Sequence, residues 1–136
     1  MPDGEKKLRV VLKRAREAGV EPTRILSSPY VRAQQTAVIA RALLQVDEEI
    51  VSESSLTPEG NPVDVWTALR AHRDVPSVLL ASHEPLCGYL TAYLLQSPLM
   101  RVDVKKGALI RIDLDRFGPE PQGVLRWILT PGLAGA

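Results

Sequence analysis

Two short turns in this 136-residue chain each place a phosphate-compatible side chain at the start of an expected helix. The first turn follows the apolar run at 24–28 and carries Arg32, whose planar guanidinium can hold two phosphate oxygens at once. The second follows the run at 77–81 and carries His83, which can donate a hydrogen bond to a phosphoryl oxygen or act in acid–base chemistry. Ser28 is placed to cap the first helix. Because free N–H groups and the helix dipole favour an anion at a helix start, the pattern predicts one oxyanion site shared by both turns.

Each of these residues also has an ordinary structural explanation. An arginine in a first helical turn is most often a solvated surface charge, and a histidine before a helix most often caps or packs. The functional interpretation rests on the agreement of two separate strand–turn–helix units. Both aim suitable groups at the carboxyl edge of the expected sheet, where ligands bind in α/β folds.

The hydrophobic pattern alternates between helices and strands along the whole chain. Helices are expected over 4–18, ending at Gly19, over 30–44 with Pro29 as first residue, from Val63 to about His72, and from Pro85 to about Leu95. Strands are expected over 24–28, near Ile50 and Val51, and over 77–81, the last buried on both faces. Segments 109–114 and 124–129 read as a hairpin. The order predicts an α/β fold, a three-layer α/β/α sandwich with a mostly parallel sheet, in one domain spanning 1–136.

The composition excludes several kinds of partner. With 17 basic and 16 acidic side chains the net charge is +1, and no dense basic run points to nucleic acid or an anionic membrane. Cys87 is the single cysteine and the two histidines have no metal-ligand spacing, so neither a disulfide, a metal nor another cofactor is expected. No apolar run approaches the roughly 18 residues of a membrane span. A cytoplasmic protein is expected.

The residues of the first turn, Ser27 to Ala37, read SSPYVRAQQTA and resemble the SSPxxRAxxTA signature of the histidine phosphatase (phosphoglycerate-mutase-like) superfamily. The second turn, SHEP from Ser82, resembles the GHEP motif of the small phosphohistidine phosphatases of the SixA type, with serine in place of glycine. The resemblance implies a phosphoglycerate-mutase-like fold, phosphate contact by Arg32, and His83 as the second active-site histidine. It also implies a phosphorylated protein or a small phosphoester as partner. The short loop over 52–62 leaves the site open and favours the phosphoprotein.

The resemblance is incomplete at the family's nucleophile. The family carries an Arg-His-Gly motif after its first strand, and the histidine of that motif attacks phosphorus. No Arg-His-Gly occurs in this chain, and His72, expected on the surface at a helix C-terminus, does not replace it. Pro2 to Glu5 resembles a first helical turn with Met1 at the cap, where methionine cannot accept an N–H bond. We therefore expect the chain to be N-terminally truncated relative to the family, with the first strand of the sheet missing.

Two consequences of that departure are expected. A missing inner strand would leave a slot of unpaired backbone groups, with poor stability or self-association through the unpaired sheet region unless the neighbouring strands close up. The complete form would hydrolyse phosphoryl groups through a phosphohistidine intermediate, whereas this chain would be inactive or severely impaired. The alternative is a non-catalytic phosphate- or phosphoprotein-binding module.

Four further residues near the two turns could take part in the chemistry. Glu53 and Glu59 lie in the 52–62 loop and could protonate a leaving group, although loop carboxylates are usually only solvated. Glu84 could orient His83 but is better placed to stabilise the helix start. Cys87, in the first turn of the same helix, could act as a nucleophile if its pKa were depressed, although a lone cysteine there is more often part of the core.

Overall fold

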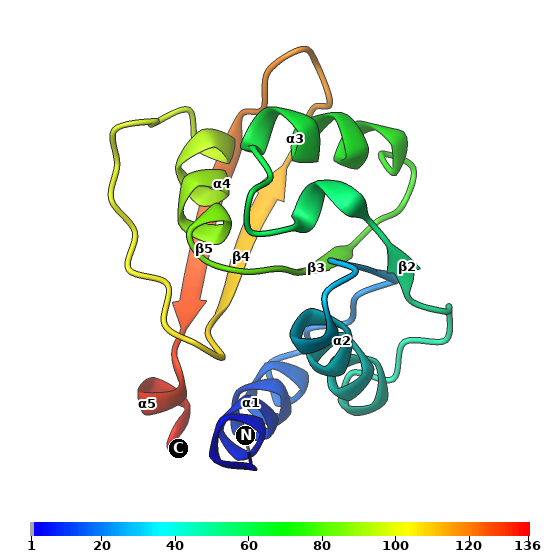
Figure 1. The fold of residues 1–136 in the computed structure, drawn as a ribbon, viewed down its shortest axis with the longest axis vertical. Coiled ribbons are helices and arrows are strands. Elements are labelled where there is room, and N and C mark those ends of the chain that lie inside the picture. The colour runs from blue at the N-terminus through cyan, green and yellow to red at the C-terminus, as the bar shows by residue number, and fades with distance from the viewer. Residues whose placement is uncertain (1) are drawn as a thin grey trace.

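Three short parallel strands form one sheet, seen in a computed structural model that describes residues 2–136 (Figure 1). The strands are β1 (Arg24–Ser27), β2 (Val51–Ser52) and β3 (Val78–Ala81), in the order β2-β1-β3. Ser27 is in register with Ser52 on one side and with Ala81 on the other. The strands therefore end together, and the turns that follow β1 and β3 start at the same edge of the sheet.

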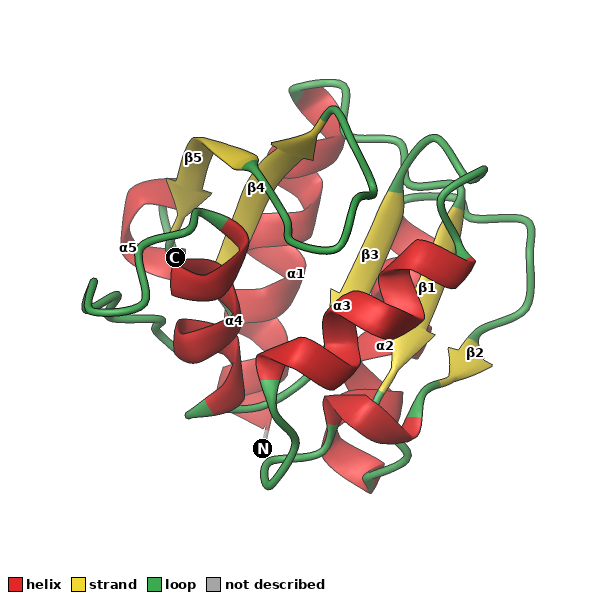
Figure 2. Cartoon of the chain, turned by 90° about the horizontal axis from the view of Figure 1, so that it is seen from above, coloured by secondary structure: helices red, strands yellow, loops and turns green. Residues whose placement is uncertain are grey.

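Helices cover both faces of this sheet, as the view from above shows (Figure 2). One face is packed against α1 (Pro2–Glu17) and α2 (Val31–Leu43), through a core that includes Leu12, Ala37 and Ile25. The other face is packed against α3 (Pro62–Ala71) and α4 (Leu86–Leu94), through a core that includes Trp66, Leu86 and Leu26. Ile25 and Leu26 are neighbours on β1 and point to opposite faces, as strand geometry requires. The expected three-layer α/β/α architecture is confirmed.

The last two strands, β4 (Leu109–Leu114) and β5 (Gly123–Leu129), form an antiparallel hairpin, as the alternating pattern predicted. Gly123 is required there, because a Cβ atom at this position would lie 2.7 Å from a methyl group of Ile112 and 2.8 Å from the Leu94 carbonyl oxygen. A short α5 (Pro131–Ala134) follows the hairpin, and a 3₁₀ turn (Ser54–Leu56) lies in the loop after β2. Neither of these two short elements was predicted.

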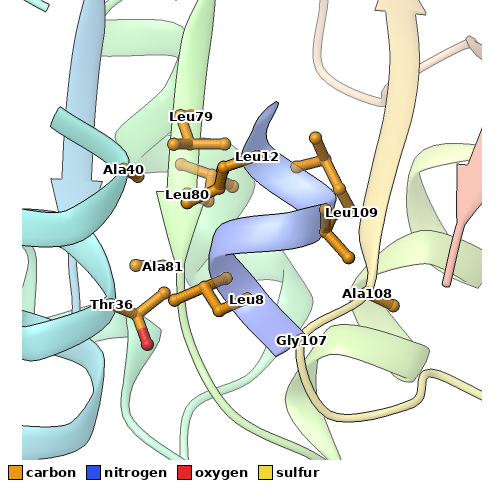
Figure 3. A pocket seen from close by; sticks show the side chains of 11 residues that line it. Leu8, Leu12, Thr36, Ala40, Leu79, Leu80, Ala81, Gly107, Ala108 and Leu109 are labelled. Carbon is orange, nitrogen blue, oxygen red and sulfur yellow. The ribbon is translucent and has the colours of Figure 1, made fainter. Parts of the chain in front are cut away.

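The hairpin does not join the parallel sheet. β3 pairs only with β1 among the described residues, and β4 pairs only with β5. A small cavity of about 60 Å³ lies between them. Its lining is apolar, and Figure 3 shows Leu79 and Leu80 of β3 facing Leu109 of β4 across it, with Leu8 and Leu12 of α1 beside them. We call this gap between β3 and β4 the slot.

The slot explains one wrong prediction about burial. Val78, Leu79 and Leu80 were expected to be buried on both faces, but all three are only partly buried. A strand in the interior of a parallel sheet is covered by neighbours on both edges, whereas β3 has a strand neighbour on one edge alone within the described chain. The neighbouring strands have not closed up over the gap.

Element boundaries agree with the sequence pattern to within two residues. α1 begins at Pro2 rather than at residue 4. α2 begins at Val31 rather than Pro29, and α4 begins at Leu86 rather than Pro85. Gly19 has the positive φ of 88° expected of the residue that ends α1. The predicted capping position of Met1 lies outside the described residues.

Candidate phosphate-binding site

Ser28 and His83 are in direct contact at the carboxyl edge of the parallel strands. His83 Nε2 lies 2.8 Å from Ser28 Oγ. Ser28 is fully buried, and its N–H donates to the Ala81 carbonyl (2.9 Å), which continues the β1–β3 pairing into the turns. The two turns predicted to share one site therefore meet at a hydrogen bond between their side chains.

Ser28 does not cap α2, which corrects the role expected for its hydroxyl. The hydroxyl instead accepts a hydrogen bond from the N–H of Tyr30 at 3.2 Å, within the turn itself. Tyr30 has extended backbone angles at the N-cap position, and no side chain caps the helix there. The turn closed by the Ser28 hydroxyl and the Tyr30 N–H keeps residues 28–30 outside helical geometry, so α2 begins only at Val31.

Arg32 remains in the first turn of α2, as expected. It is exposed, and in the part of the chain described here its guanidinium has no hydrogen-bond or ion-pair partner. The N–H groups of residues 31–33 precede the first intrahelical bond, from Gln34 N–H to the Tyr30 carbonyl. An unpaired guanidinium therefore accompanies a helix start that can bind an anion. No hydrogen bond joins Arg32 to His83 in residues 2–136.

The environment of His83 favours its neutral form. Partial burial lowers the pKa of the imidazole, and the negative charge of Glu59 opposes this shift more weakly. The ring of Tyr30 lies against the imidazole, with ring centroids 5.3 Å apart and planes tilted by 58°. A neutral imidazole keeps one N–H that it can donate to an oxyanion.

The three acidic residues considered as accessories have different partners. Glu53 accepts hydrogen bonds from the N–H (3.1 Å) and hydroxyl (2.8 Å) of Ser55, so its carboxylate caps the 3₁₀ turn. Glu84 accepts the N–H of Gly88 at 2.8 Å, which is the helix-capping role favoured over orienting His83. Glu59 accepts the phenol hydrogen of Tyr30 at 2.5 Å. Of the three carboxylates, Glu59 is the one linked to His83, through the tyrosine ring.

Cys87 has the wrong environment for a nucleophile. Burial and the nearby charge of Glu84 raise the pKa of its thiol to about 11, although a hydrogen bond with Ser82 opposes the shift. A raised pKa leaves very little thiolate at neutral pH, and the thiolate is the reactive form. The nucleophilic role considered for Cys87 is therefore not supported, and the core role is.

We expect the Cys87 thiol to react with iodoacetamide at pH 7.5 at least about 100-fold more slowly than a free cysteine, because its thiolate fraction is correspondingly smaller. Mass spectrometry over a time course measures the rate. In urea the rate should rise to that of free cysteine. A native rate equal to the free rate would contradict the buried environment.

His72 lies at the other end of β1. It is the C-cap residue of α3, and its Nδ1 is 3.0 Å from a guanidinium nitrogen of Arg24, the first residue of the strand. Arginine only donates, so His72 is the acceptor. At about 3.3 Å per residue, the four-residue strand separates this histidine from the Ser28 end by roughly 10 Å. His72 therefore does not face the candidate site.

Tyr30 was not singled out from the sequence. Nothing in the spacing of SSPYVR distinguishes an aromatic ring that covers His83 from one that packs in the core or points to solvent.

Residues 2–136 contain neither a candidate metal site nor a membrane-spanning helix. No group of three histidine, cysteine, aspartate or glutamate side chains is arranged to hold a metal ion, and no helix is both long and apolar enough to cross a membrane.

Comparison with known proteins identifies clear relatives, although no family model matches the chain. Phosphohistidine phosphatase SixA of Escherichia coli K12 is 34% identical over 116 residues, which cover 82% of this chain and 68% of that protein. A SixA homologue of Haemophilus influenzae is 40% identical over 75 residues, covering 52% of this chain and 46% of that protein.

Solved structures of SixA proteins also resemble this chain. The structure of the protein histidine phosphatase SixA complexed with tungstate matches with a TM-score of 0.77 and 31% identity, over 92% of this chain and 79% of that one. A protein from Agrobacterium tumefaciens described as a putative SixA matches with a TM-score of 0.75 over 96% and 82% of the two chains. Its identity of 18% supports the fold alone.

Proposed function

This chain belongs to the SixA-type phosphohistidine phosphatases of the histidine phosphatase superfamily, and from that premise we propose that Arg32 and His83 bind the phosphoryl group of a phosphorylated protein, with Ser28 as an accessory that positions His83. The observation that carries the proposal is the Ser28–His83 contact at the strand ends, beside the free guanidinium on α2. Tungstate, present in the similar SixA structure, is a tetrahedral oxyanion like phosphate. Cys87 is a free thiol, which is compatible with the reducing cytoplasm, so we propose that the chain meets this partner there.

Arg32 and His83 would act on different parts of the phosphoryl group. Arg32 would hold two oxygens with its planar fork, and the N–H groups at the start of α2 would add partial positive charge. His83 would donate one hydrogen bond to an oxygen, where negative charge grows as the group is transferred. Ser28 would fix the imidazole through its 2.8 Å contact.

Turnover through a phosphohistidine intermediate needs a further histidine. Its nitrogen must attack phosphorus while the bond to the leaving group breaks, and water must then cleave the new N–P bond. The chain has two histidines, of which His83 is proposed to assist and His72 is bound to Arg24 at the far end of β1. We therefore propose that this chain binds phosphoryl groups but turns them over slowly or not at all. A non-catalytic phosphoprotein-binding module is the alternative, and both readings share the binding step.

Assays of binding and turnover on the same sample test this proposal. Isothermal titration with phosphate or vanadate should show saturable binding, and phosphate release from a phosphohistidine protein or p-nitrophenyl phosphate should be marginal. His83→Ala should weaken binding, whereas His72→Ala should not. Substantial turnover would overturn the view that the chain lacks a nucleophile, and the two variants would show which histidine supplies it.

We also propose that the slot supports self-association. The Ser77 and Ala81 carbonyls bond to the β1 side, so the alternating backbone of β3 directs the polar groups of Val78 and Leu80 to the slot. Exposed strand edges of this kind pair readily with another chain.

Light scattering after size exclusion should show oligomers that increase with protein concentration. Leu109→Lys places a charge in the apolar slot and should reduce association, because edge lysines block strand pairing. Val124→Lys is the matched control, on the exposed residue of the other hairpin strand. A monomer at all concentrations would refute the proposal, and an effect of Val124→Lys alone would place association at β5.

A further inference from the structure

Tyr30 connects two parts of the site that are remote in sequence. Its hydroxyl donates to a carboxylate oxygen of Glu59, 29 residues away, at 2.5 Å. Its ring packs on the imidazole of His83, 53 positions further along the chain, at 5.3 Å between centroids. One side chain therefore ties the 52–62 loop to the turn after β3, through the same imidazole that contacts Ser28.

Among the three carboxylates on the segments around His83, Glu59 is the one that accepts its hydrogen bond from the Tyr30 phenol. The other carboxylates on the neighbouring segments are held by backbone N–H groups, Glu53 by Ser55 and Glu84 by Gly88. The cation on the neighbouring helix, Arg32, forms no ion pair with Glu59 among residues 2–136. The Tyr30 hydroxyl thus sets the position of the Glu59 carboxylate, which is otherwise exposed to solvent.

We infer that Tyr30 is a positioning residue that holds the Glu59 carboxylate beside His83, where the carboxylate selects against ligands carrying more negative charge than a single phosphoryl group. This inference rests on the proposed function, because it assigns the specificity of the same site. A fixed negative charge at the mouth repels the further phosphates of pyrophosphate, nucleotides and sugar bisphosphates. A phosphoryl group on a histidine side chain brings no such extra charge, since its leaving group is an imidazole that gains a proton. The pair therefore favours ligands with a single phosphoryl group, such as phosphohistidine, over polyanionic phosphoesters.

The pKa of His83 responds to both neighbours. Burial lowers the pKa of the imidazole, and the charge of Glu59 acts in the opposite direction and more weakly. The hydrogen bond to Glu59 is also the largest cause of the raised pKa of Tyr30, so the phenol stays protonated and continues to donate. Loss of the hydroxyl should free the carboxylate to move into solvent.

A double-mutant cycle that measures the pKa of His83 tests the positioning role of Tyr30, and it needs no catalytic turnover. The imidazole titration is followed by NMR in the wild-type chain, in Tyr30→Phe, in Glu59→Gln and in the double variant, with His72→Ala used to assign the signal. Each single change should lower the His83 pKa, and the double change should lower it no further than Glu59→Gln. Tyr89→Phe, on an exposed tyrosine, and Glu49→Gln, on an exposed glutamate, should leave it unchanged. A His83 pKa in Tyr30→Phe equal to that of the wild type would overturn the positioning role.

Binding of inorganic phosphate and of pyrophosphate tests the specificity. Tyr30→Phe and Glu59→Gln should each raise pyrophosphate affinity relative to phosphate affinity by about two- to fivefold at low salt, and added salt should reduce the difference. An unchanged ratio in both variants would overturn the inference. If neither anion binds to the wild-type chain, the proposed function fails, and the His83 titrations still decide whether Tyr30 positions Glu59.

Discussion

Replacing Arg32 with alanine is expected to weaken phosphate binding by about 10- to 100-fold, the effect of losing charge-assisted hydrogen bonds to two oxygens. The guanidinium is exposed and unpaired within the described chain, so its removal breaks no internal contact, and the free energy of unfolding should stay within about 0.5 kcal/mol of wild type. Isothermal titration with phosphate measures the loss, and urea unfolding checks the fold.

Two further variants separate the possible causes of that loss. Arg32→Lys keeps the charge but not the planar fork, so its affinity should lie between those of the wild type and Arg32→Ala. Arg73→Ala removes an exposed arginine just beyond the C-terminus of α3, next to His72 and away from the strand carboxyl ends, and should have no effect. Equal binding by wild type and Arg32→Ala would remove Arg32 from the site. Equal losses in Arg32→Ala and Arg73→Ala would show that net charge alone is responsible.

Replacing Trp66 with alanine is expected to lower the free energy of unfolding by about 3–5 kcal/mol, the usual cost of deleting a buried large aromatic side chain. Trp66 is 2% exposed and stacks on Phe117 with centroids 5.4 Å apart and planes within 6°. Its indole N–H also donates to the Gly118 carbonyl at 3.1 Å. These contacts join α3 to the loop between β4 and β5, so the hairpin is held to the body partly through this ring.

Urea unfolding followed by circular dichroism measures that change. Trp66→Phe keeps an aromatic ring but loses the hydrogen bond, and should be less destabilising than Trp66→Ala. Leu99→Ala is the control, because Leu99 is 94% exposed and its removal should change stability by less than about 0.5 kcal/mol. A loss below about 1 kcal/mol for Trp66→Ala would show that this core is not the one that holds the hairpin.

The sequence predicted the parts of the site that depend on strand order. Arg32 and His83 each follow an apolar strand, and parallel strands end at one edge, so the two turns had to lie together once β1 and β3 were paired in register. The observed Ser28–His83 contact follows from that register. The capping role of Glu84 was also predicted, because it depends on neighbours within four residues along the chain.

The parts that could not be predicted depend on distances between loops. Tyr30 and Glu59 meet because the 52–62 loop folds back over the turn after β1, and no periodic pattern records that approach. The late start of α2 has a similar origin. The Ser28 hydroxyl could cap the helix, but it instead accepts the N–H of Tyr30 within the turn and contacts His83. The partial exposure of β3 reflects an edge without a strand neighbour among the described residues. The apolar run at 77–81 does not reveal that edge, although the absence of an Arg-His-Gly strand predicted an unpaired slot in the sheet.

Locating the bound anion on the chain tests most directly whether the turns after β1 and β3 form a phosphoryl-binding site. Backbone amide spectra of the ¹⁵N-labelled protein are recorded during titration with inorganic phosphate and, separately, tungstate. We expect saturable shifts centred on the amides of Ser28, Arg32 and His83, with both anions affecting the same residues and with His72 unaffected. Shifts that do not saturate, or that centre on residues away from the turns after β1 and β3, would contradict the assignment of this edge as a phosphoryl-binding site.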